Sequence, residues 1–481
     1  MPERAMPPST SLDVWPPEFS LHNGPPQMLL TAVAFILALG LLIAVHEYGH
    51  YRVAVACGVK VLRFSVGFGK PLLRWQPKGS PTEFVLGAFP LGGYVRMLDE
   101  REAPVPTEER HLAFNTQPLR SRAAVVAAGP VANLLLAVLL YSIVNWNGVQ
   151  EPKAVLASPV AGSVAQSAGL RGGEWVAGAA LGSDDMEPVR SFEDLRWLLT
   201  RGALEGVNVR LDVQPPSRGT HREIVLDMSR IDSREADAQL FRKIGILGPW
   251  TRPVLGEVMP DGAAARAGLR QGDVVLKVGA SDVVDGQQLR ELIRQSVRGN
   301  QPLAQPWQID RAGQVVSVEV LPEAKAELGM TVGRIGAYVG ASPEFVTVEY
   351  GIFEGAWAGV VKTWDVAILT LKMMGRMVIG EASLKNLSGP LTIADYAGRS
   401  ASLGLTQYLV FLALISVSLG VLNLLPLPVL DGGHLMYYLW EGVTGRGVSD
   451  VWMERLQRGG VAILLLMMSI ALFNDITRLF G

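Results

Sequence analysis

Four long apolar runs constrain this 481-residue chain more than any other feature of its sequence. Residues 29–45, 123–150 and 400–430 contain no charged side chain, and residues 459–474 form a fourth apolar run. A helix needs about 20 apolar residues to cross the hydrocarbon core of a bilayer, with a range near 17–25. The first three runs satisfy this length. The fourth run is shorter, but side chains just before it can snorkel toward the membrane surface and so lengthen the segment that crosses. We therefore expect a polytopic α-helical membrane protein with four transmembrane helices.

The charge balance excludes several classes of protein. Charged residues make up 18% of the chain, below the ~25% of an average soluble protein, and apolar residues make up 49%. The 43 basic and 45 acidic residues leave a net charge of −2, so no basic surface points to nucleic acid as a partner. Cys57 is the single cysteine, which excludes an intramolecular disulfide and a multi-thiolate metal site.

The distribution of Lys and Arg predicts how the chain is threaded through the membrane. Residues 51–122 contain 11 of them, whereas the short flanks on the other side contain only Arg4 before the first run and Arg478 after the last. By the positive-inside rule, residues 51–122 are cytoplasmic. We then expect the N-terminus, the long middle of the chain and the C-terminus on the opposite side of the membrane.

The apolar runs and the soluble composition between them divide the chain into six expected segments. They are a Pro-rich leader at 1–27, either disordered or upstream of a true start at Met28; the first two spans with a re-entrant β loop at 28–148; PDZ-like domains at 150–236 and 240–322; amphipathic membrane-surface helices at 323–400; and the last two spans at 401–481.

An internal repeat lies in the soluble middle. The letters AGLR followed by GE at 168–174 reappear as AGLR followed by GD at 267–273, an offset of 99 residues. Each copy precedes an apolar strand, a helix-like stretch and a β-rich run. This pattern resembles PDZ modules, which bind extended peptides by strand addition. The alternative is a pair of unrelated α+β domains that share a turn by chance.

Residues 349–380 allow two interpretations. Large apolar side chains recur there at helical spacing, but charged side chains interrupt them. We expect an amphipathic helix on the outer membrane face. A fifth span is the alternative, and it would reverse the side of everything that follows it. The residues concerned are the apolar Trp357, Val361, Trp364, Ile368 and Leu371 and the charged Lys362, Asp365, Lys372 and Arg376.

The letters HEYGH at 46–50 form an H-E-x-x-H motif at the end of the first apolar run. On a helix, residues i and i+4 share a face, so His46 and His50 can reach one metal ion with Glu47 beside it. Zinc suits this ligand set, and its bound water becomes a nucleophile near neutral pH. Glu47 would take the proton of that water and pass it to the leaving amine. The alternative is a pair of helical histidines with structural partners.

A catalytic zinc takes three protein ligands, so one more is needed. Asp431 ends the third apolar run. The first and third runs both travel inward, which places His46, His50 and Asp431 at similar depth near the cytoplasmic side. His434 is the rival third ligand, and an Asp-Gly-Gly turn at a helix end is the structural alternative for Asp431.

The sequence also indicates where a substrate would lie. Pro426 and Pro428 cannot sustain regular helix, and freed backbone groups in a membrane are tolerated only beside a cavity or other protein. Asn423 either hydrogen-bonds a substrate backbone or caps the broken helix. Residues 82–97 are apolar but interrupted by glycines, which favours a re-entrant β-hairpin over a spanning helix. An exposed strand edge there could pair with an unwound substrate, and an ordinary cytoplasmic hairpin is the alternative.

Taken together, these motifs resemble the site-2 protease family of intramembrane zinc metalloproteases. The resemblance is closest to its bacterial regulator-of-sigma-E branch, which carries tandem PDZ domains, and it covers nearly the whole chain from Met28. The matching stretches are HEYGHYRVAVACGVKVLRFSVGFGKPL at 46–72, PLGGYVRMLDER at 90–101, GPVAN at 129–133, the two repeats, GPLTIADYAG at 389–398 and NLLPLPVLDGGH at 423–434.

This resemblance implies one Zn²⁺ per chain, held by His46, His50 and Asp431, with Glu47 as the catalytic base. It also implies a substrate-binding role for residues of the broken helix and of the 82–97 loop. These residues are Asn423, Pro426, Pro428, Gly92, Gly93 and Tyr94.

The resemblance further implies a setting and a set of partners. The setting is the bacterial inner membrane, with the N-terminus, PDZ pair and C-terminus periplasmic and the active site near the cytoplasm. The substrates would be pre-trimmed single-pass membrane proteins, namely anti-sigma factors and signal-peptide remnants, and their cleavage would trigger an extracytoplasmic stress response. The PDZ pair would exclude untrimmed ectodomains by size. Lys243 to Ile246 resembles a carboxylate-binding PDZ loop for peptide C-termini, although a lysine departs from the usual small first residue.

Two other functions compete with a membrane endopeptidase. A non-catalytic PDZ scaffold or sensor with a vestigial metal site would have no need of the base Glu47, which is intact. An ion or metal transporter would use the same residues as a midplane site, but four spans without inverted repeats disfavour it. We therefore predict a zinc endopeptidase that cleaves transmembrane segments.

Overall fold

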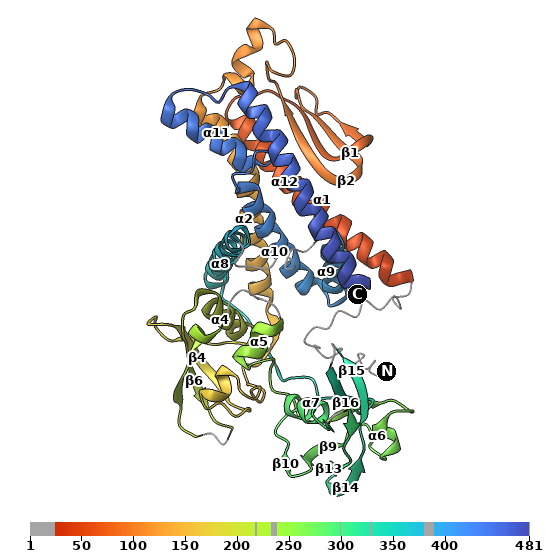
Figure 1. The fold of residues 1–481 in the computed structure, drawn as a ribbon. Helices are drawn as coiled ribbons and strands as arrows, with labels where there is room; N and C mark the ends of the chain where they lie inside the picture. Colours follow the sequence, from red (N-terminus) through yellow and green to blue (C-terminus); the bar gives the residue numbers. More distant parts are fainter. Residues whose placement is uncertain are drawn as a thin grey trace. The chain divides into compact units, whose positions relative to one another are not determined.

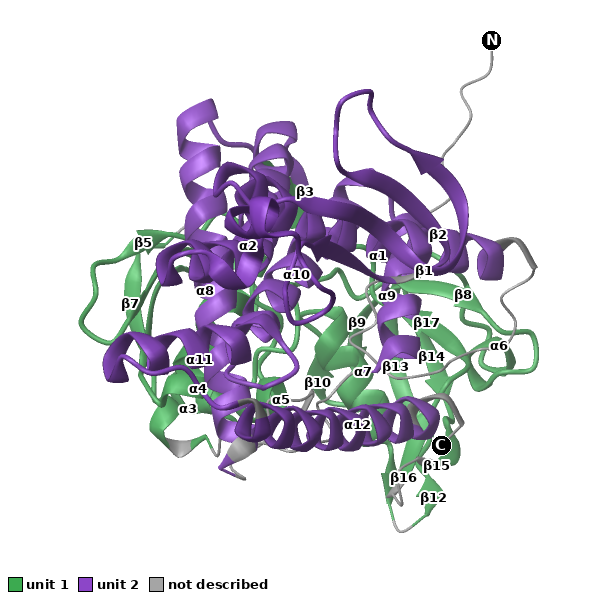
Figure 2. Ribbon diagram, turned by 90° about the horizontal axis from the view of Figure 1, so that it is seen from above, with its two compact units in different colours: residues 1–16, 150–348 green, residues 17–149, 349–481 purple. Residues whose placement is uncertain are grey.

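The computed structural model describes residues 25–216, 219–231, 238–298, 300–327, 330–379 and 389–480, so most of the predicted leader lies outside the described residues. The chain divides into two compact units, which Figure 2 shows in different colours. The helical unit comprises residues 17–149 and 349–481, and the β unit comprises residues 1–16 and 150–348.

Four described helices of the helical unit are long and apolar enough to cross a membrane, as the sequence predicts. The helix α8 (Ile352–Val378) is not among them, so the alternative of a fifth span finds no support in the described part of the chain. Its place on the membrane surface stays a prediction. The four helices are α1 (Pro25–Ala56), α2 (Leu119–Asn147), α10 (Leu405–Leu424) and α12 (Asp450–Phe480).

The helix α2 lies at the centre of the helical unit. It packs against α1, α8, α10 and α11 (Asp431–Thr444), and Figure 1 shows it between α8 and α10. Small residues allow α1 and α2 to cross closely, since a Cβ at Gly49 of α1 would collide with the carbonyl oxygen of Ala128 of α2. In a membrane, such residues let helix backbones approach closely and gain packing contacts. The shorter α9 (Pro390–Ser402) packs against α1, α10 and α12.

Two long strands, β1 (Val61–Trp75) and β2 (Glu83–Met97), connect α1 to α2 as an antiparallel hairpin. Both halves of β2 lie beside the same part of β1, because Phe64 is paired with Val95 and also with Phe84. The predicted β structure at 82–97 is present, but its partner is β1 rather than a second half of the same segment. Figure 1 shows the hairpin at the same end of the helical unit as α11. Its entry into a membrane stays a prediction.

The internal repeat is visible in the β unit as two four-stranded sheets of equivalent strand order. One sheet has the order β5-β4-β6-β7 and the other β10-β9-β13-β14. A helix follows the first two strands of each sheet, α4 (Phe192–Glu205) in the first module and α7 (Gly286–Arg294) in the second. The strands are β4 (Trp175–Leu181), β5 (Glu187–Pro188), β6 (Val209–Gln214), β7 (Arg222–Leu226), β9 (Val274–Val278), β10 (Ser281–Asp282), β13 (Gln305–Arg311) and β14 (Gln314–Val320).

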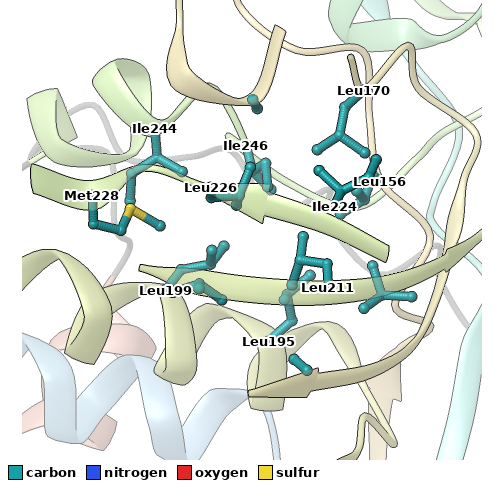
Figure 3. Packing of buried hydrophobic residues seen from close by; sticks show 14 of the residues in the cluster. Leu156, Leu170, Leu195, Leu199, Leu211, Ile224, Leu226, Met228, Ile244 and Ile246 are labelled. Atoms are coloured by element: carbon teal, nitrogen blue, oxygen red, sulfur yellow. The ribbon is translucent and has the colours of Figure 1, made fainter. Parts of the chain in front are cut away.

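Each β module has its own apolar core, and each core extends past the boundary expected from the sequence. Figure 3 shows the first core, which includes Ile244 and Ile246 together with Leu199 and Leu211, whereas the expected end of the first domain is residue 236. In the second core, Ile335 is buried with Trp307, beyond the expected end at 322. The reason is the same in both modules, because the chain returns to the core after the last strand of the sheet.

The acidic residue of the repeated turn is buried and fully bonded in both modules. Glu174 accepts hydrogen bonds from the backbone N–H groups of Arg171 and Gly172 at 2.9 and 2.7 Å and from the guanidinium of Arg222 at 3.2 Å. Asp273 accepts equivalent bonds from Arg270 and Arg311, described further below. These residues explain why the turn recurs with Glu or Asp at one position.

Helices are expected from residue 323 onward, but the segment begins with four described strands. The first described helix after residue 323, α8, begins at Ile352. The strands there are β15 (Glu323–Glu327), β16 (Met330–Arg334), β17 (Ala337–Val339) and β18 (Phe345–Val348). The remaining described strands and helices are β3 (Val149–Pro152), α3 (Val164–Ser167), α5 (Ala238–Ile244), β8 (Leu255–Val258), α6 (Ala263–Arg266), β11 (Val297–Arg298), β12 (Gln301–Pro302) and 3₁₀ turns at Thr107–Leu112, Phe114–Thr116 and Met228–Arg230.

Candidate metal centre

Two helix ends bring the predicted metal ligands together. His46 and His50 lie one turn apart near the C-terminal end of α1, and Asp431 is the first residue of α11. The helix α10 ends at Leu424, and residues 425–430 form an irregular connection that includes both prolines. This break turns the chain, so that Asp431 starts a new helix instead of continuing the old one.

The three candidate ligand atoms lie at the separations of a tetrahedral metal site. Nε2 of His46 lies 3.1 Å from Nε2 of His50 and 3.2 Å from Oδ2 of Asp431. The distance from Nε2 of His50 to Oδ2 of Asp431 is 3.5 Å. Bonds of about 2.0–2.1 Å in a tetrahedral zinc site place ligand atoms about 3.3–3.4 Å apart. Among the described residues, this is the one group of three or more His, Cys, Asp or Glu side chains that could hold a metal ion.

The environment of Asp431 keeps its carboxyl ionised. Burial raises the pKa, but hydrogen bonds from His46 and His50 and their charges outweigh it, and the pKa falls to about 2. The site is therefore a half-buried carboxylate beside two imidazoles, which is the nitrogen and oxygen donor set of a three-ligand catalytic zinc.

The far nitrogens of both imidazoles face α2. Nδ1 of His50 lies 2.8 Å from the carbonyl oxygen of Val125, and Nδ1 of His46 lies 3.4 Å from the side-chain nitrogen of Asn133. Gly129 lies between these contacts, and a Cβ there would come within 2.2 Å of Nε2 of His50. The glycine is thus required to leave room for the rings.

Sequence reasoning assigned no role to these α2 residues, although the GPVAN stretch at 129–133 was part of the family resemblance. One signal was available, because Asn133 is a polar side chain inside an uncharged apolar run, and such residues in membrane segments often have a function.

Glu47 lies between the ligand cluster and the β1–β2 hairpin. A Cβ at Gly93 of β2 would come within 2.8 Å of Cγ of Glu47, so the strand passes directly beside this side chain. In the described part of the chain, the Glu47 carboxylate accepts no hydrogen bond. It is therefore free to interact with a water molecule or a substrate group.

The other two residues predicted on the hairpin have contacts within β1 and β2. Gly92 has a φ of +106°, and a Cβ there would lie 2.3 Å from the ring of Phe68. The ring of Tyr94 stacks on Phe68, with centroids 6.1 Å apart, and its hydroxyl accepts a hydrogen bond from Arg63. The structure thus brings Gly93 to Glu47, whereas Gly92 and Tyr94 shape the strand beside it.

The residues predicted on the broken helix lie at its end. Asn423 occupies the last turn of α10, and the cap of that helix is a backbone bond from Leu425 to Leu422, so the capping alternative for its side chain finds no support. Pro428 packs near α12, where a Cβ at Gly460 would lie 3.2 Å from the proline ring. Gly433 packs on the carbonyl oxygen of Leu427, which requires a residue without a side chain after Asp431.

His434, the rival ligand, is not part of the ligand cluster formed by the described residues. Its ring packs at right angles against Tyr437 with centroids 5.9 Å apart. It also lines a surface pocket with Asp99 and Arg101, and burial lowers the pKa of His434 despite the opposing charge of Asp431.

Comparison with known proteins identifies the family of the chain over most of its length. The family model described as peptidase family M50 matches residues 34–467. A protein of Ralstonia nicotianae named as a zinc metalloprotease is 41% identical over 466 residues, covering 94% of this chain and 99% of its own length. The regulator of sigma-E protease RseP of Escherichia coli strain K12 is 40% identical over 458 residues, covering 93% of this chain and 98% of its own. The chain therefore belongs to peptidase family M50 and is a zinc metalloprotease of the site-2 type.

Proposed function

We propose that this protein hydrolyses peptide bonds within transmembrane segments of other membrane proteins, with one Zn²⁺ held by His46, His50 and Asp431. The observation that carries this proposal is the convergence of three ligand atoms at 3.1–3.5 Å at the ends of apolar helices. A zinc ion bound there supplies Lewis-acid polarisation and lowers the pKa of water to about 7. The chain itself must orient the ion, position the substrate and move protons.

Proton transfer falls to Glu47. Its carboxylate lies on the same helix as both histidines, next to His46, and accepts no hydrogen bond from the described residues. A general base needs a free lone pair within reach of the attacking water. We propose that Glu47 accepts a proton from this water as the water oxygen bonds to the carbonyl carbon of the peptide. Glu47 then delivers that proton to the amine nitrogen, which leaves as the carbon–nitrogen bond breaks.

We assign substrate positioning to β2 and to the C-terminal end of α10 with the irregular residues that follow it. Residues 93–97 are paired with β1 along one edge, and among the described strands the other edge has no partner. An unwound substrate can add to this edge through backbone hydrogen bonds, which places its carbonyl groups beside Glu47. We propose that Gly93 permits this close approach, that Gly92 and Tyr94 hold the strand in shape, and that Asn423 bonds the substrate backbone. Pro426 and Pro428 keep residues 425–430, which follow α10, out of helical form.

The relatives suggest the substrate class and the cellular setting. Because several are named as regulators of sigma-E protease, we propose substrates of the anti-sigma-factor type and signal-peptide remnants, and a role in an extracytoplasmic stress response. The excess of Lys and Arg in residues 51–122 supports a cytoplasmic hairpin. We propose the bacterial inner membrane as the location, with both termini and the β unit periplasmic.

We propose that the two β modules are PDZ-like and exclude untrimmed ectodomains by size. A loop that captures a peptide C-terminus needs free backbone N–H groups. In the segment Lys243 to Ile246, the N–H of Gly245 already donates to the carbonyl oxygen of Phe241 at 2.8 Å. This contact supports filtering by bulk over capture of peptide C-termini at this segment.

The test compares cleavage of a tagged single-pass substrate that lacks its ectodomain by the unmodified chain and by Glu47→Gln in the same membranes. We expect Glu47→Gln to keep its zinc and to lose at least about 100-fold in rate, within the range for general-base catalysis. Equal product from both proteins would overturn the proposal and indicate a contaminating protease. No product from either, with zinc bound, would favour a non-catalytic scaffold.

A further inference from the structure

Asn133 presents an unsatisfied atom beside the ligand cluster. The residue is 1% exposed and lies in α2, within the apolar part of the helix. Its side-chain nitrogen faces Nδ1 of His46 at 3.4 Å, while its side-chain oxygen has no hydrogen-bond partner among the described residues. A buried polar atom without a partner is costly, and such exceptions are rare in native proteins. The unpaired oxygen therefore requires an explanation.

The contact of the other histidine shows which tautomer suits the site. Nδ1 of His50 lies 2.8 Å from the carbonyl oxygen of Val125. A carbonyl oxygen only accepts, so Nδ1 of His50 carries the hydrogen, and in the neutral ring Nε2 then presents a lone pair toward His46 and Asp431. Val125 and Asn133 are about two turns apart on α2. One helix thus contacts the far nitrogen of both imidazoles.

The same tautomer in His46 needs an acceptor at Nδ1. If Nε2 of His46 binds a cation, Nδ1 must carry the hydrogen, and the side-chain nitrogen of Asn133 cannot accept it. Rotation of the carboxamide by about 180° exchanges two atoms of nearly equal size and brings the unpaired oxygen to Nδ1. The observed orientation suits the other tautomer, in which Nε2–H of His46 points to Asp431 at 3.2 Å.

We propose that Asn133 is a positioning residue for metal binding. Its side-chain oxygen accepts a hydrogen bond from Nδ1–H of His46 and so holds the Nε2 lone pair toward the cation. This inference rests on the proposed function, because it assumes that the three-residue cluster binds zinc. Partners of this kind fix the tautomer and the ring orientation of a histidine ligand and raise its basicity.

The backbone around Asn133 is held independently of the imidazole. The hydroxyl of Ser416, a fully buried residue of α10, donates to the carbonyl oxygen of Asn133 at 2.7 Å. This bond ties α2 to α10 at the level of the site. Ser416 therefore provides a matched control, since Ser416→Ala disturbs the same stretch of α2 without touching His46.

The experiment measures zinc affinity of the full-length chain in detergent, by competition with a chromophoric chelator. We compare the unmodified chain with Asn133→Leu, Asn133→Asp and Ser416→Ala. Asn133→Leu removes the acceptor and should weaken zinc binding by about 10–100-fold, the usual effect of losing such a partner. Asn133→Asp keeps an acceptor and removes the donor, so its zinc affinity should equal or exceed that of the unmodified chain. Ser416→Ala should leave the affinity unchanged.

The two Asn133 variants separate the alternatives. If Asn133→Asp weakens zinc binding as Asn133→Leu does, the side chain acts as a donor or by packing, and the inference is wrong. Unchanged affinity in Asn133→Leu, or an equal loss in Ser416→Ala, would also overturn it. If Asn133→Leu does not fold, Asn133→Asp alone decides between acceptor and donor. An unmodified chain that binds no zinc would instead refute the proposed function.

Discussion

The β unit and the helical unit each hold a carboxylate among different partners, buried in the first and half-buried in the second. Asp273 in the β unit is 1% exposed and accepts hydrogen bonds from Nε and Nη2 of Arg311 at 2.8 and 2.7 Å and from the backbone N–H of Arg270 at 2.8 Å. Asp431 in the helical unit faces Nε2 of His46 and His50 at 3.2 and 3.5 Å.

The difference separates a structural carboxylate from a ligand. The guanidinium of Arg311 is always charged and always a donor, so Asp273 needs nothing from outside the chain. An imidazole donates from Nε2 only when that nitrogen is protonated, and the contact of His50 with Val125 already places a hydrogen on its Nδ1. Asp431 thus has donors only while Nε2 of His46 or His50 is protonated, and a bound cation can take their place when both imidazoles are neutral at that nitrogen.

The largest effect is expected from Asp431→Asn. Removing a residue that only hydrogen-bonds a zinc ligand lowers metal affinity by about 10–100-fold. Removing a ligand itself should therefore lower zinc affinity and the rate of cleavage by at least about 100-fold. The free energy of unfolding without zinc should change little, because no arginine loses its partner. Zinc content and cleavage of an ectodomain-free substrate measure this in one preparation, and full cleavage by Asp431→Asn would remove the distinction between the two carboxylates.

The opposite result is expected from Asp273→Asn. Hydrogen bonds to charged groups contribute about 1.5–3 kcal/mol, so the free energy of unfolding of the second β module should fall by about 2–3 kcal/mol. Cleavage of the ectodomain-free substrate should stay unchanged. Hydrogen exchange over residues 253–340 of the full chain gives the measurement. Asp282→Asn is the control, because its ion pair with Lys277 is exposed and should contribute less than about 1 kcal/mol. Equal losses in both variants would contradict the account.

A smaller effect is expected at a structural ion pair of the helical unit. Arg122 of α2 donates to both carboxylate oxygens of Glu441 of α11 at 2.6 and 3.2 Å. Since α11 begins with Asp431, this pair fixes the helix that carries a ligand. Arg122→Gln and Glu441→Gln should each destabilise the chain, with a coupling of about 1–2 kcal/mol in a double-mutant cycle followed by thermal unfolding. Additive effects would show that the pair does not hold α11 in place.

The smallest effect concerns pH. Burial raises the pKa of Asp273, but the hydrogen bonds of Arg311 and Arg270 outweigh it, so the folded pKa lies below its usual value. The stabilisation by Asp273 is therefore complete above the unfolded pKa of about 3.9 and is lost as the pH falls through the lower folded pKa. Protection of the second β module from hydrogen exchange should fall more steeply below about pH 4 than in Asp273→Asn. Parallel pH profiles in the two proteins would contradict this assignment.

Much of this architecture follows from local sequence patterns. Four spans are predicted by uncharged runs such as 123–150, and the pair His46 and His50 follows from helical spacing. The repeated AGLR turn predicts two equivalent modules, and its acidic residue is explained by its contacts with arginine. In each case the information lies within one short stretch of chain.

Features that depend on contacts between distant segments were not predictable in this way. The partner of β2 is β1, and no pattern within 82–97 specifies it. The roles of Gly129 and Asn133 appear only once α2 is packed on α1 beside the histidines. The closing segments of both β cores lie past the expected boundaries because they follow the sheet strands in sequence and join them only in the fold.

X-ray absorption at the zinc edge of the full-length, zinc-loaded chain tests the central claim most directly. The account predicts one zinc per chain with two imidazole nitrogens at about 2.0–2.1 Å and an oxygen shell that includes Asp431. A sulfur ligand at about 2.3 Å, or a shell without imidazole, would contradict the assignment of His46, His50 and Asp431 as the metal ligands.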